Sequence, residues 1–322
     1  MNAGGTAGRL LVSLALMVLL AGCASSPPSV KKMADIPYER ANPPLVPGML
    51  DVYAPAKAGP WPVVVMLHSP EGDKAEMGGR AGKVADLGFV VFTPNWGGGI
   101  SAVAPTHDGL LAINSQAACA VAFARAHAAD YGGDPATMIV FGHSGGAMVA
   151  AQVAFARPEP SAGCLGGNSL GAIDALVTWE GSWVLSVPSS VWDGPLAADP
   201  RVLDAQTVWP YVAAHRDLKV VILVSEHPGP QFERKVGDPW AADSWLAARD
   251  PSGDLRRQLE ASGAFADGTL DLAEVQQLLF SVLKAQGNPV SLDVMPGSTH
   301  ADLSGEGWKV FLAAFPKAAA QD

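Results

Sequence analysis

The sequence predicts an α/β fold, with a mostly parallel central sheet and helices on both of its faces. Short apolar, β-branched runs alternate with longer helix-forming stretches along most of the chain, as in sheets built from strand–helix–strand units. The strand-like runs are apolar throughout, as expected for strands that are covered on both faces. The expected strands cover residues 48–54, 62–67, 89–93, 137–141, 175–179, 220–225 and 291–294, and the expected helices cover 81–87, 106–131, 274–283 and 306–319, with another that ends near 156.

The composition is that of a globular chain with an acidic balance. Of the 322 residues, 49% are hydrophobic and 16% are charged, which excludes a disordered chain. The formal net charge is −10 and no long Lys/Arg cluster occurs. We therefore expect no nucleic-acid partner.

Residues 1–23 have the features of a processing segment. A positive charge at Arg9 precedes an apolar run of about twelve residues, which is too short to span a bilayer but suits a signal peptide. The run ends at Leu20-Ala21-Gly22-Cys23, which resembles the lipobox of bacterial lipoproteins. The resemblance implies that Cys23 is lipidated and anchors the protein to a membrane. Ala24, where an Asp would retain a lipoprotein in the inner membrane, implies the outer membrane facing the periplasm.

After this segment we expect a flexible tether over 24–47, which is rich in Pro and Ser, and then a catalytic domain over 48–322. Two insertions, at about 181–217 and 228–270, interrupt the alternation and carry several tryptophans. Insertions after the strands of such sheets usually lie over the carboxyl ends, where ligands bind. The indoles would line an apolar substrate pocket or simply pack the insertions onto the domain.

The strongest motif is a strand, a tight turn and a helix centred on Ser144. The apolar run 137–141 stops at Gly142, and Gly142 to Gly146 has the G-x-S-x-G pattern of a nucleophile elbow. A Cβ at either flanking glycine would clash where strand and helix approach. The same pattern recurs around Ser169, but no strand precedes it and no helix follows. We therefore predict Ser144 as the nucleophile.

A serine nucleophile needs an oriented base. His300 lies in the loop 296–300, after a late strand and before the last helix, where the base belongs in the chain order serine, acid, histidine. Two carboxylates follow strands between Ser144 and His300, namely Glu180 and Glu226. The residues alone leave both as candidates for the triad acid.

An oxyanion hole needs backbone N–H donors. One is expected from Gly145, directly after the nucleophile. The other should come from the loop 68–72, where Pro70 has no N–H. Ser69 is our first candidate for this donor and Glu71 the alternative.

With these residues in place, the chain resembles the α/β-hydrolases of the esterase, lipase and dienelactone-hydrolase-like group over roughly 48–316. The stretch ADYGGDP leading into VFGHSGG is similar to that of bacterial carboxylesterases, and GSTHADL is similar to the histidine loop of platelet-activating-factor acetylhydrolases and polyester hydrolases. VVVMLHS resembles the strand and oxyanion loop, but lacks the glycine-rich loop that those esterases usually carry.

This resemblance implies a serine hydrolase that cleaves small-molecule or lipid carboxyl esters through an acyl-enzyme. It also favours Glu180 over Glu226, because the acetylhydrolase-like branch takes its acid from the earlier strand. The alternatives are a weakly active or inactive lipoprotein that acts as a binding module, and a lipid acyl-hydrolase or peptidase.

No metal or cofactor is expected. The segment 267–274 resembles half of an EF-hand loop, but Gly263 and Phe265 occupy the first and third ligand positions and offer no side-chain oxygen. Asp271 and Glu274 suit a helix cap better.

Two cysteines, Cys119 and Cys164, would remain after processing. An exported protein can oxidise such a pair, but the sequence leaves a disulfide and two buried thiols as alternatives.

Overall fold

The computed structural model describes residues 29–40, 45–97, 106–181, 200–202, 204–228 and 272–315, with short pieces at 234–235, 253, 257, 261 and 269–270. The signal segment, Cys23 and most of both insertions lie outside the described residues. Four of the tryptophans that we expected near a pocket, Trp183, Trp192, Trp240 and Trp245, are among these.

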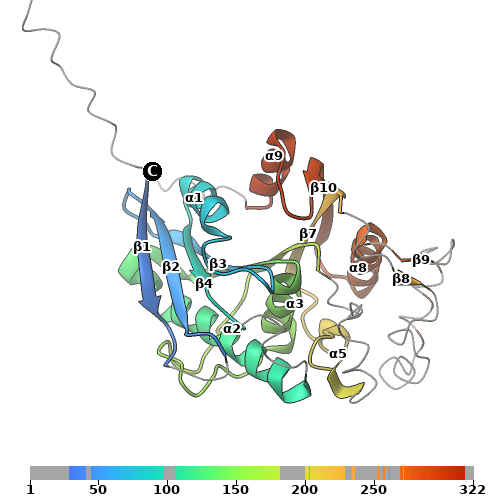
Figure 1. Ribbon diagram of the computed structural model, residues 1–322, viewed down its shortest axis with the longest axis horizontal. Helices are drawn as coiled ribbons and strands as arrows, with labels where there is room; N and C mark the ends of the chain where they lie inside the picture. The colour runs from blue at the N-terminus through green and yellow to red at the C-terminus, as the bar shows by residue number, and fades with distance from the viewer. Residues whose placement is uncertain are drawn as a thin grey trace, which may run out of the picture.

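One eight-stranded sheet organises the fold, in the order β1-β2-β4-β3-β5-β6-β7-β10 (Figure 1). β1 pairs antiparallel with β2, and β2 with β4, whereas the other neighbours in this sheet are parallel. Two short strands, β8 and β9, form a separate pair. The strands are β1 (Val30–Pro37), β2 (Met49–Pro55), β3 (Trp61–Leu67), β4 (Val90–Pro94), β5 (Gly133–His143), β6 (Ala175–Trp179), β7 (Lys219–His227), β8 (Arg234–Lys235), β9 (Thr269–Leu270) and β10 (Val290–Thr299).

Helices cover both faces of the sheet. α1 (Gly78–Asp86) and α9 (Gly305–Ala313) lie on one face, and α2 (His107–His127), α3 (Gly145–Ala151) and α8 (Leu272–Gln286) lie on the other (Figure 1). Shorter helical turns are Ala128–Tyr131, Gln152–Ala156, Pro200–Val202 and α5 (Trp209–Val212). The mostly parallel, doubly covered sheet that the sequence predicts is therefore confirmed.

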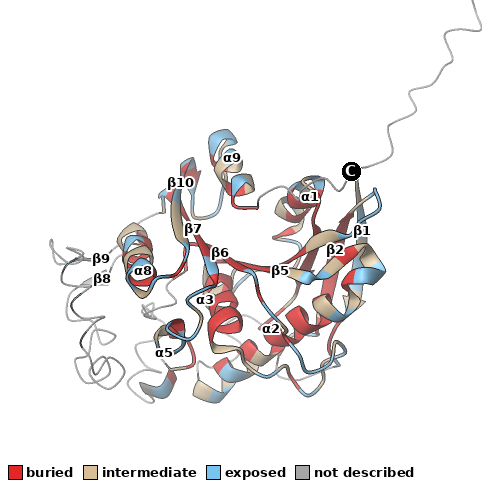
Figure 2. Cartoon of the chain, turned by 180° about the vertical axis from the view of Figure 1, so that it is seen from behind, coloured by how far each residue is buried: buried red, intermediate tan, exposed pale blue. Residues whose placement is uncertain are grey.

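The sheet divides the core into two apolar clusters. Alternate residues of β3 point to opposite faces, so Val63 and Val65 pack with α2, α3 and α8, whereas Val64 and Met66 pack with α1 and α9. Figure 2 shows the buried positions concentrated along the central strands and on α3. Burial on both faces explains why the parallel strands have continuous apolar sequences.

The long helix α2 begins at a side-chain cap. The Oγ1 of Thr106 accepts a hydrogen bond from the N–H of Gly109 at 3.0 Å, which satisfies one of the free donors of the first turn. Gly132 follows the helical segment with φ at 77°, a conformation that favours glycine. The cap and the glycine thus mark the two ends of the helical stretch that the sequence predicts over 106–131.

The expected tether is wrong for residues 30–39. Residues 30–37 form β1 at the edge of the sheet, and Tyr38 and Glu39 are buried. The buried carboxylate of Asp51 in β2 contributes to this edge, because it accepts from the N–H of Asp35 at 3.1 Å and pairs with Lys32 at 2.8 Å. The folded domain thus begins near residue 30 rather than 48.

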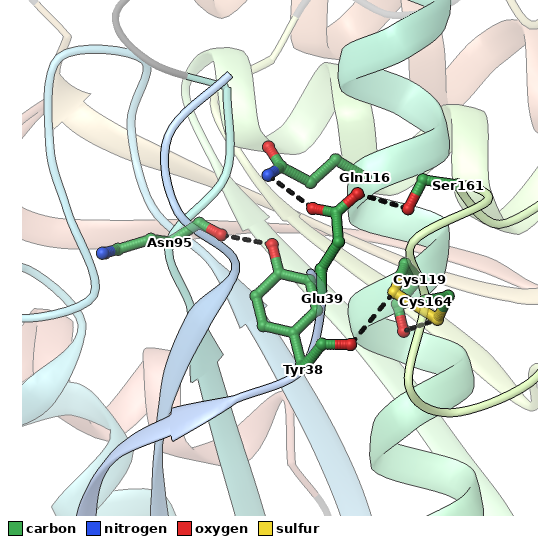
Figure 3. Close-up of a disulfide and its surroundings, with 7 residues drawn as sticks. All are labelled: Tyr38, Glu39, Asn95, Gln116, Cys119, Ser161 and Cys164. Carbon is green, nitrogen blue, oxygen red and sulfur yellow. Dashed lines mark hydrogen bonds between the residues drawn. A yellow bond between two sulfur atoms is a disulfide. The ribbon is translucent and has the colours of Figure 1, made fainter. Parts of the chain in front are cut away.

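Cys119 of α2 forms a disulfide with Cys164, in the loop that follows α3 (Figure 3). Beside it, the buried carboxylate of Glu39 accepts from the Oγ of Ser161 and, at 2.8 Å, from the Nε2 of Gln116. The bridge and this buried hydrogen-bond cluster together tie the end of β1 to α2. The structure therefore contains the bridge that the sequence left open.

Candidate active site

Ser144 stands at a strained turn between β5 and α3. Its backbone φ and ψ are 56° and −124°, a conformation rare for a residue with a side chain and common at nucleophile elbows. A Cβ on Gly142 would lie 2.1 Å from the backbone oxygen of Gly146, and one on Gly146 would lie 2.2 Å from that of His68. The glycines therefore have the steric role that the sequence predicts.

The triad candidates Glu180 and His300 are in direct contact. Glu180 follows β6, and its side chain is 0% exposed. Its Oε2 hydrogen-bonds the Nδ1 of His300, and its Oε1 accepts from the N–H of Ser225. A carboxylate on Nδ1 holds the proton there, which leaves Nε2 as the basic nitrogen.

Glu226 does not reach the imidazole. Its side chain is 50% exposed, and its Oε2 accepts from the N–H of Gly297 at 2.6 Å. It thus supports the loop within β10, where the pairing with β7 shifts register between Met295 and Thr299. The structure brings Glu180, rather than Glu226, to His300.

The elbow and the histidine loop meet through His143, which precedes the nucleophile. The Nε2 of His143 lies 2.7 Å from the backbone oxygen of His300, and the two rings are 4.9 Å apart between centroids. The N–H of Ser144 also donates to the backbone oxygen of Trp179 at 2.8 Å, one residue before Glu180. Ser144, Glu180 and His300 therefore share one end of the parallel strands.

The loop after β3 departs from the expected oxyanion hole. The N–H of Ser69 donates to Oε2 of Glu76 at 3.1 Å, so this amide already has an acceptor. Pro70 packs beside the elbow, because a Cβ on Gly145 would lie 2.2 Å from its Cγ. Glu71 lies within a turn closed by the N–H of Gly72 and the oxygen of Ser69 at 3.0 Å. Ser69 would serve as an oxyanion donor only after leaving Glu76.

Gly145 is better placed as a donor. It opens α3, and the first N–H groups of a helix have no acceptor within the helix. They also carry a partial positive charge that favours a developing anion. The amide of Gly145 is therefore placed to donate to an anion that forms beside Ser144.

A mostly apolar pocket opens next to Gly145. Its lining includes Trp96, Leu110, Ile113, Met148 and Val149. The indole of Trp96 is nearly buried and stacks on the ring of His68, with 5.1 Å between centroids. Since α2 and α3 supply most of the wall, the pocket lies between these two helices.

Sequence reasoning missed Glu76. It lies between β3 and α1 and accepts from the Oγ of Ser69 at 2.6 Å. Its burial raises the carboxyl pKa, but hydrogen bonds from His143 and Ser69 outweigh this and lower the pKa to about 2. The only signal in the sequence is a carboxylate shortly after a core strand, which has no distinctive spacing.

Burial lowers the pKa of two histidines at this site. His68 is packed under Trp96, and His143 is packed between Trp179 and His300. Loss of hydration disfavours the charged imidazolium in both cases. For His143 the carboxylate of Glu76 opposes this shift.

Within the described ranges, no group of His, Cys, Asp and Glu side chains is arranged to hold a metal ion. No helix among these residues is long and apolar enough to cross a membrane.

The BD-FAE family model matches residues 50–177, which run from within β2 to within β6 and include the elbow. No curated protein sequence matches this chain.

Three solved structures with a similar fold are esterases. The propionate-bound esterase Est2 from Thermogutta terrifontis superposes with a TM-score of 0.57 at 15% identity, over 89% of this chain and 92% of that chain.

An inhibited esterase B from Lactobacillus rhamnosis gives a TM-score of 0.60 at 14% identity, over 89% of this chain and 86% of that chain. A truncated carbohydrate esterase from gut microbiota gives a TM-score of 0.55 at 15% identity, over 90% of this chain and 97% of that chain. Similarity at this level of identity concerns the architecture. With its elbow, mostly parallel sheet and covering helices, the chain has the α/β-hydrolase fold.

Proposed function

We propose that this chain is a serine hydrolase that cleaves carboxyl esters through an acyl-enzyme intermediate. The observation that carries the proposal is the contact of His300 with a buried carboxylate, Glu180. This contact lies at the same carboxyl end of the parallel strands as the strained Ser144. A nucleophile, a base and an orienting acid are the components of acyl transfer, and here they follow the chain order serine, acid, histidine.

In the proposed reaction, the Oγ of Ser144 attacks the ester carbonyl while Nε2 of His300 takes its proton. The N–H of Gly145 donates to the oxyanion. The tetrahedral intermediate collapses, and the imidazolium gives its proton to the departing alkoxide. Water, deprotonated by His300, then attacks the acyl-serine. The second tetrahedral intermediate collapses, the imidazolium returns its proton to the Oγ of Ser144, and the acid is released. Glu180 stabilises the imidazolium throughout without taking its proton.

The pocket beside Gly145 supports a proposal for the substrate class. Its open volume of about 20 Å³ is little more than that of one water-sized group, so as it stands it limits the acyl group to a small one. Its lining is mostly apolar, with the uncharged amides of Asn114, Gln152 and Gln206 and no charged side chain, which disfavours a charged acyl group. The pocket is adjacent to the amide that would hold the carbonyl. We infer esters with a short apolar acyl group. The similar Est2 was solved with propionate and with butyrate, which agrees with an acyl group of this size.

A fluorophosphonate probe tests the mechanism, because it reacts only with an activated serine. We expect the mature protein to be labelled and Ser144→Ala not to be. Ser169→Ala is the matched control, since Ser169 is exposed and occupies the second G-x-S-x-G pattern. Equal labelling of Ser144→Ala, or no labelling of the wild-type protein, would reject the proposal.

A binding module without catalysis is the second candidate, and the oxyanion loop favours it. Pro70 offers no N–H, and the amide of Ser69 is held by Glu76. An intact fold that binds an ester but is not labelled by the probe would support this alternative.

We further propose that the protein is exported and anchored through lipidated Cys23 at the outer membrane, facing the periplasm. The disulfide between Cys119 and Cys164 supports export, because such bonds persist in oxidising compartments. Cys23→Ser should move the protein from the detergent phase to the aqueous phase in a partitioning experiment. Unchanged partitioning would contradict the anchor.

A further inference from the structure

We propose that Glu76 and His143 are positioning residues, which hold the catalytic histidine loop in register with the elbow; Glu76 also fixes the loop after β3 through Ser69. The inference rests on the proposed serine mechanism for its catalytic consequence, whereas its geometry stands independently. Neither residue is expected to touch the substrate. They would act through the backbone of His300 and through Ser69.

A single carboxylate connects the two loops. One oxygen of Glu76, Oε1, lies 2.9 Å from Nδ1 of His143, whose Nε2 lies 2.7 Å from the backbone oxygen of His300. The other oxygen, Oε2, accepts from the N–H of Ser69 at 3.1 Å and from its Oγ at 2.6 Å. Glu76 therefore contacts the oxyanion loop directly and the histidine loop through one imidazole.

The partners of His143 determine where its protons must be. Nε2 faces a carbonyl oxygen, which can only accept, so Nε2 must carry a proton. Nδ1 faces a carboxylate oxygen of Glu76, so this contact also needs a proton between the two groups. The geometry therefore places one proton on Nε2 and calls for a second between Nδ1 and Glu76. The carboxylate of Glu76 favours this second proton, whereas burial of His143 opposes it.

Arg80 of α1 holds the next residue of the same loop. Its Nη2 donates to the backbone oxygen of Ala301 at 2.9 Å, and its Nη1 donates to the backbone oxygen of Glu76 at 3.0 Å. Its guanidinium lies over the ring of Trp179, 4.8 Å from the centroid. The same indole lies against the ring of His143, with 4.2 Å between centroids and a tilt of 31°. Two successive carbonyls, at residues 300 and 301, are therefore fixed by cationic or imidazole donors.

This arrangement bears on the rate of reaction rather than on binding. Fixing the backbone at His300 fixes the direction from which its ring meets both Glu180 and Ser144. A displacement of about 1 Å in a reacting group can reduce the rate about 100-fold. Loss of the hydrogen bond from His143 to the backbone oxygen of His300 should therefore lower kcat and leave KM nearly unchanged.

Two substitutions of His143 distinguish the loss of its hydrogen bond to the His300 backbone from a general effect on folding. Gln places its amide nitrogen near the position of Nε2, so His143→Gln keeps a donor for the backbone oxygen of His300. Asn places its amide near Nδ1, so His143→Asn keeps a partner for Glu76 but leaves that oxygen without its donor. We expect His143→Asn to lower kcat about 10- to 100-fold, with KM within about twofold, and His143→Gln to recover most of the loss.

A measurement on the wild-type protein makes the test independent of activity and of whether the variants fold. Nitrogen NMR of histidine-labelled protein reports which ring nitrogens carry protons, and His143→Gln assigns the signals. We expect Nε2 of His143 to be protonated around neutral pH. An unprotonated Nε2, or equal kinetics for the Asn and Gln variants, would overturn the proposal. A protein that shows protonated Nε2 but cleaves no ester would instead contradict the proposed function.

Discussion

The Nδ1 of His300 hydrogen-bonds the Oε2 of Glu180 across 120 residues of sequence. Glu226 lies near the end of the next strand of the sheet, β7, yet its carboxylate accepts from the N–H of Gly297 instead. The two carboxylates therefore differ in burial as well as in partner. This difference allows the triad acid to be tested by matched substitutions.

Glu180→Gln should lower kcat for a nitrophenyl ester by about 10³- to 10⁴-fold, because an amide cannot hold the imidazole in the required tautomer or stabilise the imidazolium. Glu226→Gln should stay within about threefold, since its amide oxygen still accepts from Gly297. Steady-state kinetics on both variants check this. A larger loss in Glu226→Gln than in Glu180→Gln would reverse the assignment.

Gly146→Ala should prevent the elbow from forming. The new Cβ would lie 2.2 Å from the backbone oxygen of His68, and backbone cannot move aside as a flexible side chain does. We expect a loss of about 3 kcal/mol or more in the free energy of unfolding. Urea denaturation measures the change.

Gly82→Ala is the matched control for this effect. Gly82 lies within α1, and a Cβ there would meet nothing within 4 Å. The same change should stabilise the protein by about 0.5–1 kcal/mol, because alanine favours a helix over glycine. Equal destabilisation by both variants would show that the close approach of Gly146 to the His68 backbone does not exclude a side chain.

Removing the disulfide with Cys119→Ala and Cys164→Ala should destabilise the fold. The cysteines are 45 residues apart, and the chain-entropy model assigns a loop of this length about 4 kcal/mol. Urea midpoints of the wild type and the double variant measure the loss. A reducing agent should lower the midpoint of the wild type and leave that of the double variant unchanged.

The carboxylate of Glu76 should make stability depend on pH. Its pKa falls from 4.5 to about 2 on folding, because His143 and Ser69 hydrogen-bond the charged form and outweigh the burial that raises it. A depressed folded pKa contributes stability above pH 4.5 that is lost as the pH falls toward 2. The advantage of the wild type over Glu76→Gln should therefore shrink through this window. Thermal unfolding at several pH values checks it, and a difference that stays constant would contradict it.

Widening the pocket should change the preferred acyl chain. Met148→Ala removes a side chain that lines the pocket beside Gly145. The kcat/KM for esters with longer acyl groups should therefore rise relative to that for acetate esters. One methylene in an apolar pocket changes kcat/KM about tenfold or more. Nitrophenyl esters of increasing acyl length measure the ratio of kcat/KM between longer acyl groups and acetate. Leu111→Ala on α2, whose side chain is 43% exposed, should leave this ratio unchanged.

Much of the fold follows from local patterns. Apolar runs buried on both faces differ clearly from capped, alanine-rich helices, and so β3 to β7, β10 and the main helices lie close to their expected positions. The edge strand β1 was not predicted, because its exposed face and polar residues such as Lys31 and Lys32 resemble a linker. Its stability comes from pairing with β2 and from Asp51, which no local pattern encodes.

The sequence by itself determined the elbow at Ser144 and the candidate base His300, because steric demand and chain order are local properties. It also limited the triad acid to two carboxylates that follow strands. Only the tertiary structure decided which of these meets the imidazole, that Cys119 lies against Cys164, and that Glu76 binds Ser69 and His143. Each of these contacts joins segments far apart in the chain, and their distance depends on strand order and on the register shift in β10 rather than on residue type.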